Sequence, residues 1–328
     1  MPCLEPRLGH APHGRRDHRD HRDRGHRGDR HRGGERWGGR EPRRDPERPK
    51  IADEIVGEPL YGVSPVIAAL AAGRRELHAL YLQEAAAGGP RDDDRRQRKK
   101  ERNAAALRRA EEVAAERGVP VRRVSKHDLN LVSNHRPHQG LVLDASPLGF
   151  TPLKAMPDVA DGLGALTANR SVWLALDEVM DPQNFGAILR SAHFLGVDGV
   201  VTCGRNSAPL SPAVSKASAG AMELADVYSC KSFPSFLKDA AAAGWEVLGA
   251  SLADEAVDCA ALRLEGPTLV VIGNEGAGLR ALVRQACTKL VKIQGGAAPL
   301  GGLQAVDSLN VSVAAGVVLH HLTSQREA

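Results

Sequence analysis

The chain has 328 residues and a net charge of +4, and 42% of its residues are hydrophobic, 3% aromatic and 26% charged, which is enough chain for two ordinary domains. Its apolar runs, such as residues 172–176, are far shorter than the roughly 20 residues that span a bilayer, so the composition excludes a membrane protein. The five cysteines are odd in number and form no CxxC or Cys/His cluster, which argues against a disulfide scaffold and a metal site.

Residues 1–52 are predicted to form a disordered, cationic tail. Residues 1–50 hold 15 Lys and Arg against 9 Asp and Glu, and the stretch from Leu8 to Arg48 has almost no aliphatic side chains. Such a segment cannot bury enough surface to offset the entropy of ordering. We expect it to add nonspecific affinity for a polyanion, with metal chelation by its histidines as the weaker alternative. Its acidic residues do not fit an organelle transit peptide.

Residues 53–147 are predicted to form a small α/β domain. Order is predicted to begin near Ile55, where IVGEPLYGVSPVIAAL passes from glycine- and proline-punctuated sequence into a helix-like run. Residues 91–117 are charged and rich in helix formers, which predicts a solvated helix or, as an alternative, one with a phosphate-contacting face. Prolines then mark a linker over 148–170. The predicted strands are 78–82, 121–125 and 140–145.

Residues 171–323 alternate between predicted strands and helices. Continuous apolar strands separated by helices are typical of a parallel sheet that is covered on both faces, so the fold class is α/β. The predicted strands are 172–179, 196–203, 245–251, 268–273 and 290–293, and the predicted helices are 185–195, 279–287 and 308–321.

Three loops of this second domain carry unusual sequences. In an open parallel sheet, ligands bind beyond the carboxyl ends of the strands, and the segments that follow three of the strands read DPQNFGAILRSAHFLGVD, IGNEGAGL and SLNVSVAAG. In this order, they resemble the three signature motifs of the SpoU (TrmH) family of RNA ribose 2′-O-methyltransferases. Residues 57–84 and 138–144 are similar to the RNA-binding domain of that family, so the resemblance covers 53–323.

The resemblance implies a fold, a cofactor and a substrate. The C-terminal domain would be a trefoil-knotted parallel-sheet methyltransferase that uses S-adenosylmethionine and acts as a homodimer. Residues 205–228 look most like the mitochondrial and bacterial-type enzymes that methylate a guanosine ribose in large-subunit rRNA, which implies an organelle such as the mitochondrion. The alternatives are a tRNA ribose 2′-O-methyltransferase and a noncatalytic RNA-binding ribosome assembly factor with the same fold.

The motifs also assign site residues by resemblance. An arginine is effectively always protonated and is a poor general base, so we expect the arginine of the first motif to be essential without itself being the base. The catalytic candidates are Asn184, Arg190, Glu275, Ser308 and Asn310, and the cofactor-binding candidates are Gly273, Gly276, Ile293 and Leu309.

Each candidate has a structural interpretation as well. Asn184 could be only a turn residue, and Arg190 could pair with Glu275 in a structural role. Ser308 is expected to cap the last helix in any case, because Ser often precedes a long apolar-periodic run. The apolar cofactor candidates would otherwise belong to the core. Residues 294–307 (QGGAAPLGGLQAVD) are longer than in relatives, and they either bulge into solvent or weaken cofactor affinity.

Overall fold

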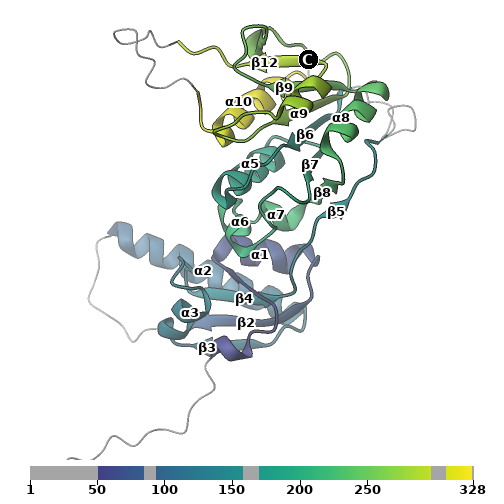
Figure 1. The fold of residues 1–328 in the computed structure, drawn as a ribbon. Helices are drawn as coiled ribbons and strands as arrows, with labels where there is room; N and C mark the ends of the chain where they lie inside the picture. The colour runs from purple at the N-terminus through teal and green to yellow at the C-terminus, as the bar shows by residue number, and fades with distance from the viewer. Residues whose placement is uncertain (1–50, 85–93, 158–169, 297–307, 327–328) are drawn as a thin grey trace, which may run out of the picture. The chain divides into compact units, whose positions relative to one another are not determined.

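The computed structural model describes residues 51–84, 94–157, 170–296 and 308–326. The predicted disordered tail lies outside the described residues except for its last two positions, which belong to a short 3-10 helix, Ile51–Glu54. The described chain builds one sheet of four strands and one of eight (Figure 1). None of its helices combines the length and the apolar character that crossing a membrane requires.

The four-stranded sheet is mixed, with strand order β1-β4-β2-β3. Strand β4 pairs antiparallel with β1 and β2, whereas β2 and β3 run parallel, joined by the long helix α2. The strands are β1 (Glu58–Tyr61), β2 (Leu77–Gln83), β3 (Val121–Val124) and β4 (Leu141–Ala145), and the helices are α1 (Val63–Ala72), α2 (Asp94–Glu116) and α3 (Lys126–Val132).

The sequence predicted three of these strands and two of the helices, but it missed β1 and α3. Strand β1 lies in the glycine- and proline-punctuated stretch before the predicted helix-like run, where Pro59 and the flanking glycines hid a strand of only four residues. Helix α3 is capped by Ser125, whose side chain accepts a hydrogen bond from the backbone amide of Asp128. This Ser-x-x-Asp spacing is a capping signal that could have located the helix.

The eight-stranded sheet is parallel throughout, with strand order β10-β12-β9-β11-β6-β7-β8-β5. The α/β class that the sequence predicted is therefore confirmed. Its strands are β5 (Thr151–Pro152), β6 (Val172–Leu176), β7 (Gly199–Cys203), β8 (Val227–Cys230), β9 (Glu246–Ala250), β10 (Val257–Asp258), β11 (Thr268–Ile272) and β12 (Lys289–Lys292). Strand β5 lies in the predicted linker, at the edge of the sheet, where proline is tolerated.

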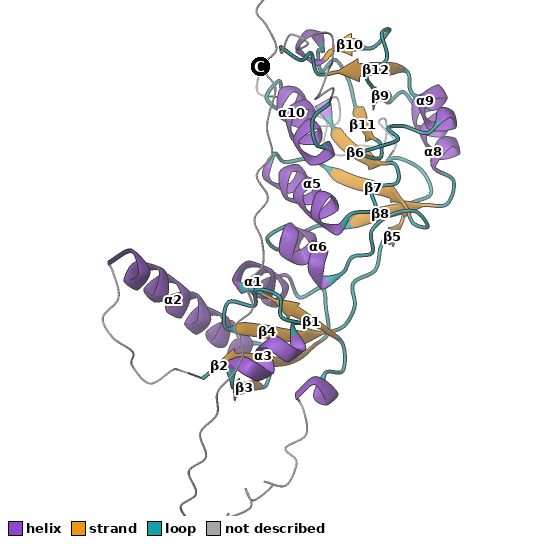
Figure 2. Cartoon of the chain, turned by 60° about the vertical axis from the view of Figure 1, so that its left-hand side comes forward, coloured by secondary structure: helices purple, strands orange, loops and turns teal. Residues whose placement is uncertain are grey.

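Helices cover both faces of this sheet (Figure 2). Helices α5 and α10 lie over one face, with α6 and α7 near α5, while α8 and α9 lie over the other face, and a 3-10 helix follows β10. Their bounds are α5 (Pro182–Phe194), α6 (Pro212–Ala217), α7 (Ala221–Leu224), α8 (Phe233–Ala242), the 3-10 helix Cys259–Ala261, α9 (Ala281–Ala286) and α10 (Val311–Thr323).

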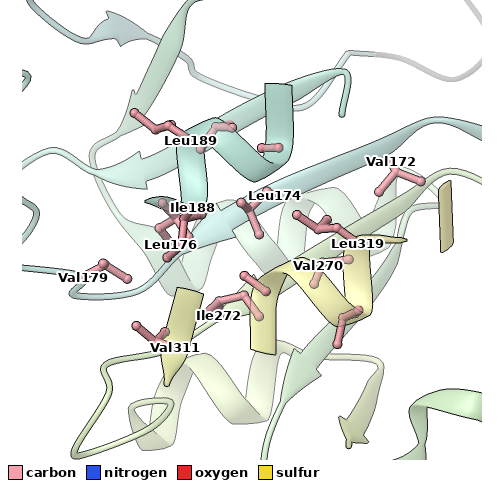
Figure 3. Packing of buried hydrophobic residues seen from close by; sticks show 14 of the residues in the cluster. Val172, Leu174, Leu176, Val179, Ile188, Leu189, Val270, Ile272, Val311 and Leu319 are labelled. Atoms are coloured by element: carbon pink, nitrogen blue, oxygen red, sulfur yellow. The ribbon is translucent and has the colours of Figure 1, made fainter. Parts of the chain in front are cut away.

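Alternate residues of β6 face the two layers. Val172 and Leu174 pack with residues of α5 and α10, as Figure 3 shows, whereas Trp173 packs with residues of α8 and α9 on the opposite face. Because both faces are covered, every residue of this strand is buried, which explains why the strand is apolar along its whole length.

A buried ion pair connects α7 with the loop that follows α1. Arg75 donates from Nε and Nη2 to the two carboxylate oxygens of Glu223 at 2.7 and 3.0 Å, and neither side chain is exposed to solvent. Ser215 donates to the same carboxylate at 2.7 Å, and Arg75 also donates to the Ser146 carbonyl at 2.7 Å. The charges are therefore well hydrogen-bonded, as buried charges must be.

The expected threading of the C-terminal chain stays a prediction. The loop that would take part in it includes residues 297–307, which lie outside the described residues. Most of the inserted stretch 294–307 falls in the same segment, so its effect on the cofactor is also untested.

Candidate functional site

The three motif loops meet at one edge of the eight-stranded sheet. Strands β6, β11 and β12 run parallel in this sheet, so their carboxyl ends lie at the same edge, where ligands bind in open α/β sheets. The first loop leads into α5, the second follows β11 directly, and the third leads into α10. Residues that are far apart in the sequence come together there.

Three of the predicted catalytic residues form a hydrogen-bonded triangle at this edge. Asn184 donates from Nδ2 to Glu275 Oε2 at 2.8 Å. Asn310 donates from Nδ2 to Glu275 Oε1 at 2.7 Å and to Asn184 Oδ1 at 3.0 Å. Both carboxylate oxygens of Glu275 thus accept hydrogen bonds from amides, so this side chain ties the first and third motifs together.

Local capping holds two corners of the triangle in place. Asp181 caps α5 because its side chain accepts a hydrogen bond from the backbone amide of Asn184 at 3.0 Å. Pro182 occupies the first helical turn, where proline is favoured. Asn310 caps α10, because its Oδ1 accepts from the Ser312 amide at 2.9 Å. The prediction that Ser308 caps this helix is therefore wrong, since the helix begins at Val311.

Asn310 has two separable roles, which predicts different outcomes for two variants. Asn310→Ala removes both the cap and the bridge to Glu275, and we expect it to lower the free energy of unfolding by about 1 kcal/mol. Asn310→Ser keeps a capping oxygen but has no amide, so its stability should stay near wild type. Chemical denaturation measures the two stabilities. Equal loss of stability in both variants would show that the bridge, not the cap, holds the helix end.

The glycine-rich second motif closes on itself. Asn274 and Gly278 exchange backbone hydrogen bonds at 2.9 and 3.0 Å, and Asn274 Oδ1 accepts from the Gly276 amide at 3.0 Å. A Cβ on Gly273 would lie 2.4 Å from the carbonyl of Gly278, which itself has a left-handed φ of +67°. Gly273 is therefore required by the closure of its own loop, and its contact with a cofactor stays a prediction.

The sequence reasoning missed an ion-paired network beside this loop. Asp177 is fully buried at the end of β6, and its carboxylate accepts from Arg280 Nε at 2.9 Å and from the Arg280 backbone amide at 3.2 Å. Its neighbour Glu178 has a left-handed φ of 59°, accepts from Asn206 Nδ2 at 2.8 Å and, through its carbonyl, from Asn274 Nδ2 at 3.1 Å. Two acids directly after an apolar strand are the signal that could have found it.

Arg190 does not join the triangle. It lies six residues after Asn184 in α5, about 9 Å along the helix axis, and its side chain is exposed. Within the described residues its guanidinium makes no hydrogen bond or ion pair, so the structure does not support the interpretation that Arg190 pairs with Glu275. Its charge is available to another molecule.

Apolar side chains lie exposed or half-buried at the same edge of the sheet as the triangle. Leu309, directly before the third corner, is exposed, and Ile293 after β12 is only half-buried against the core. Met180 and Leu252, which follow β6 and β9, are exposed at the same edge. Apolar side chains beside a few fixed polar groups are typical of small-molecule sites. Within the described residues, no cluster of His, Cys, Asp and Glu could hold a metal ion.

Comparison with known proteins finds two family matches. Residues 171–320 match the SpoU rRNA methylase family, and residues 59–151 match a family described as RNA 2′-O ribose methyltransferase substrate binding. The chain is 39% identical over 310 residues to the human protein "rRNA methyltransferase 1, mitochondrial", and the match covers 90% of this chain and 80% of that protein.

Solved structures share the fold. A crystal structure of an RNA 2′-O ribose methyltransferase superposes with a TM-score of 0.61 at 24% identity, covering 86% of this chain and 93% of the other. An rRNA methyltransferase from Sinorhizobium meliloti, solved with AdoMet bound, superposes with a TM-score of 0.57 at 21% identity, covering 83% and 89%.

Proposed function

The chain belongs to the SpoU rRNA methylase family of RNA 2′-O-methyltransferases, and we propose that it transfers a methyl group from S-adenosylmethionine to the 2′-hydroxyl of a guanosine in the large-subunit rRNA of an organelle. The observation that carries this proposal is the triangle of Asn184, Glu275 and Asn310, which joins all three motifs at the ligand-binding edge of the sheet. The human relative, named as a mitochondrial rRNA methyltransferase, supports the rRNA substrate and the organelle.

The residues of this chain would position the reactants. When bound, S-adenosylmethionine supplies a methyl group on a sulfonium, which needs little activation. The enzyme's task is then to hold a ribose hydroxyl in line with that methyl group. Glu275 keeps the loops that frame the site in register, while Gly273, Gly276, Ile293 and Leu309 would offer backbone groups and apolar surface to the adenosine part of the cofactor.

Arg190 would act on the acceptor hydroxyl. A ribose hydroxyl is a very weak acid, and negative charge develops on its oxygen as the proton leaves. The free guanidinium of Arg190 can stabilise that charge, or it can hold an RNA phosphate beside it. The amide corners of the triangle, Asn184 and Asn310, and the nearby Ser308 complete the set of polar side chains that we propose for catalysis.

A methylation assay with defined RNA tests the proposed function. The full chain is incubated with methyl-labelled S-adenosylmethionine and either unmodified large-subunit rRNA or total tRNA, and the modified nucleotide is mapped by reverse transcription at low dNTP concentration. We expect labelling of one guanosine ribose in the rRNA. Labelling of tRNA instead would support a tRNA enzyme, and cofactor-independent RNA binding without any labelling would support an assembly factor. Either result contradicts the proposal.

A second copy of the chain is the proposed partner for the face formed by α5 and α10. Phe194 at the end of α5 is 86% exposed, and Val313 and Val317 of α10 are exposed as well. Ser191 and residues of α10 line one shallow cavity, so the exposed surfaces of the two helices are continuous, and the helices lie side by side in Figure 2. An apolar patch on one protomer can pair with the same patch on its twofold mate.

Placing a charge on this face should separate the protomers. We expect Val317→Asp to shift the chain from dimer to monomer, because a carboxylate would be desolvated at the centre of a twofold interface. Size-exclusion chromatography with light scattering measures the mass. Leu282→Asp, at an exposed leucine of α9 on the opposite face, is the control and should remain dimeric. A monomeric wild type, or a Val317→Asp dimer, would contradict the proposed interface.

A further inference from the structure

The four-stranded sheet has a cavity that the proposed methyl-transfer site does not use. It has a volume of about 810 Å³ and is lined by the end of β2, the middle of α2, residues of β3 and α3, and the turn of residues 135–140. Strands β2 and β3 are parallel, so the cavity lies beyond the carboxyl ends of a β-α-β unit, where such units bind ligands. Its size suits a nucleotide.

Basic side chains dominate the charged lining. Arg123 is bound to Glu111 at 2.7 and 2.8 Å, so these charges offset each other. Arg108 and Lys126 are exposed and make no hydrogen bond or ion pair with any part of the chain that the structure describes. Both are therefore available to an anion such as a phosphate. The charged residues that line the cavity are Arg108, Arg123, Lys126 and Arg136 against Glu84 and Glu111.

The wall of the cavity holds unused amide groups. His138 is buried, and its Nδ1 accepts from the Gly140 amide at 3.0 Å, so Nε2 carries the proton and donates to Asn130 Oδ1 at 3.1 Å. Burial lowers the pKa of His138, with Lys126 and Lys216 adding to the effect, which favours the neutral ring. The hydrogen bond from His138 orients the Asn130 side chain, whose Nδ2 has no partner among the described residues. The Gln83 side chain likewise makes no hydrogen bond with the described residues.

The turn that closes the cavity has an unusual backbone. Asn134, His135 and Gln139 all have left-handed φ angles, of 51°, 57° and 56°. Non-glycine residues in this region are uncommon and cluster at ligand sites. The Gln139 side chain accepts from Lys216 Nζ at 2.7 Å, and its carbonyl accepts from Asn103 Nδ2 at 3.1 Å. The turn is thus held in this conformation from two sides.

We propose that this cavity binds an unpaired nucleotide of the RNA substrate, with Lys126 and Arg108 on a phosphate and the amides of Asn130 and Gln83 on the edge of the base. Carboxamides suit base edges, because they present a donor and an acceptor side by side. In an A-form duplex the bases are stacked and paired, and their major-groove edges lie in a deep, narrow groove, so only a splayed base can enter such a cavity. This inference rests on the proposed function, because it takes RNA as the partner, and it adds the surface of the four-stranded domain that binds a nucleotide of that RNA.

Removal of the two free charges tests the phosphate contact. Fluorescein-labelled single-stranded RNA hexamers (A6, C6 and U6) are titrated with the full chain at several salt concentrations. We expect the Lys126→Ala/Arg108→Ala variant to bind at least tenfold more weakly and to have a smaller salt dependence, because each lost phosphate contact reduces counterion release. Lys231→Ala/Lys238→Ala removes the same charge from exposed positions elsewhere and should change affinity less than twofold. Equal losses in the two variants would overturn the proposal.

A single amide substitution tests whether the base is read. Asn130→Asp keeps the oxygen that accepts from His138 but loses the free amide donor. Asn134→Asp adds the same charge in the neighbouring turn without lining the cavity. We expect Asn130→Asp to weaken hexamer binding at least threefold more than Asn134→Asp does, and to change the order of affinity among A6, C6 and U6. Binding of a blunt 12-base-pair RNA duplex should change equally in both variants. An unchanged order of affinity would overturn base reading.

The RNA-binding titrations test the nucleotide cavity independently of methyl transfer. The titrations are made without S-adenosylmethionine and are repeated in the Arg190→Ala background. If the cavity variants lose hexamer binding but wild type transfers no methyl group, the proposed function fails and this inference stands. If wild type methylates rRNA and the cavity variants bind hexamers as wild type does, this inference fails and the proposed function stands.

Discussion

Arg190→Ala is expected to reduce kcat for methyl transfer by about 100-fold or more, which is the size of effect seen when one group that stabilises developing charge is removed. The fold should be unaffected, because the side chain is exposed and makes no hydrogen bond or ion pair within the described residues, and such surface substitutions change stability by about 0.5 kcal/mol or less. Single-turnover methylation with saturating cofactor and rRNA measures the loss.

Two further variants show how Arg190 acts. Arg190→Lys keeps the charge but loses the planar fork of donors, so partial activity is expected if the charge matters and the geometry refines it. Arg284→Ala, at an exposed arginine of α9, is the control for the loss of one positive charge and should be as active as wild type. Full activity of Arg190→Ala would remove this residue from the proposed mechanism.

Glu223→Ala is expected to lower the free energy of unfolding by about 3 kcal/mol. It removes the carboxylate that accepts two hydrogen bonds from the buried guanidinium of Arg75 and leaves only the Glu58 carboxylate, at 3.3 Å, to balance that charge. Neither the Arg75 nor the Glu223 side chain is exposed, so solvent cannot compensate for the loss. Ser215 would lose its acceptor as well. The change is measured by chemical denaturation followed by tryptophan fluorescence. Stability is compared from the denaturation midpoints of variant and wild type, provided that the slope of the unfolding free energy against denaturant concentration is the same.

The adjacent arginine supplies the control for this prediction. Arg74 pairs with Asp226, and both side chains are partly exposed. Arg74 Nη1 also donates to the carbonyls of Met222 and Ala225, so Arg74→Ala should cost about 1–2 kcal/mol. Each variant removes one partner of an ion pair that joins the loop after α1 to α7 or the residues that follow it, and the two pairs differ in burial. If Glu223→Ala and Arg74→Ala lost stability to the same small extent, the ion pair of Arg75 would not be desolvated in solution.

Several parts of this fold could be predicted because the pattern was local. The apolar run at 172–176 is buried on both faces of its strand, and a run of that kind separated from the next by a helix indicates a parallel sheet. Helix α2 was predicted from its helix-forming residues alone. Strand β8 and helices α6 and α7 were not predicted, because elements of four to six residues carry too few residues for a periodic signal and are stabilised by their packing. Helix α8 was also missed, although its buried residues Phe233, Phe236, Leu237 and Ala240 follow the helical period.

The cap of the last helix shows where local reasoning fails. Ser308 and Asn310 are both good capping residues, and nothing in the sequence between them decides which one the helix uses. In the structure the Asn310 side chain also donates to Glu275 and Asn184, which are distant in the sequence. These bonds hold Asn310 where its Oδ1 accepts from the backbone amide of Ser312. Tertiary contacts therefore chose between two equal local options.

The amino-acid sequence by itself determined the parallel α/β class, the three loops that carry the polar residues and the family to which they belong, because apolar periodicity and contiguous motifs are properties of neighbouring residues. Only the tertiary structure decided that Asn184, Glu275 and Asn310 bond to one another, that Arg190 has no hydrogen-bond or ion-pair partner among the described residues, and that Asp177 pairs with Arg280. These contacts join positions 35–126 residues apart, and their geometry depends on how the strands are ordered in the sheet.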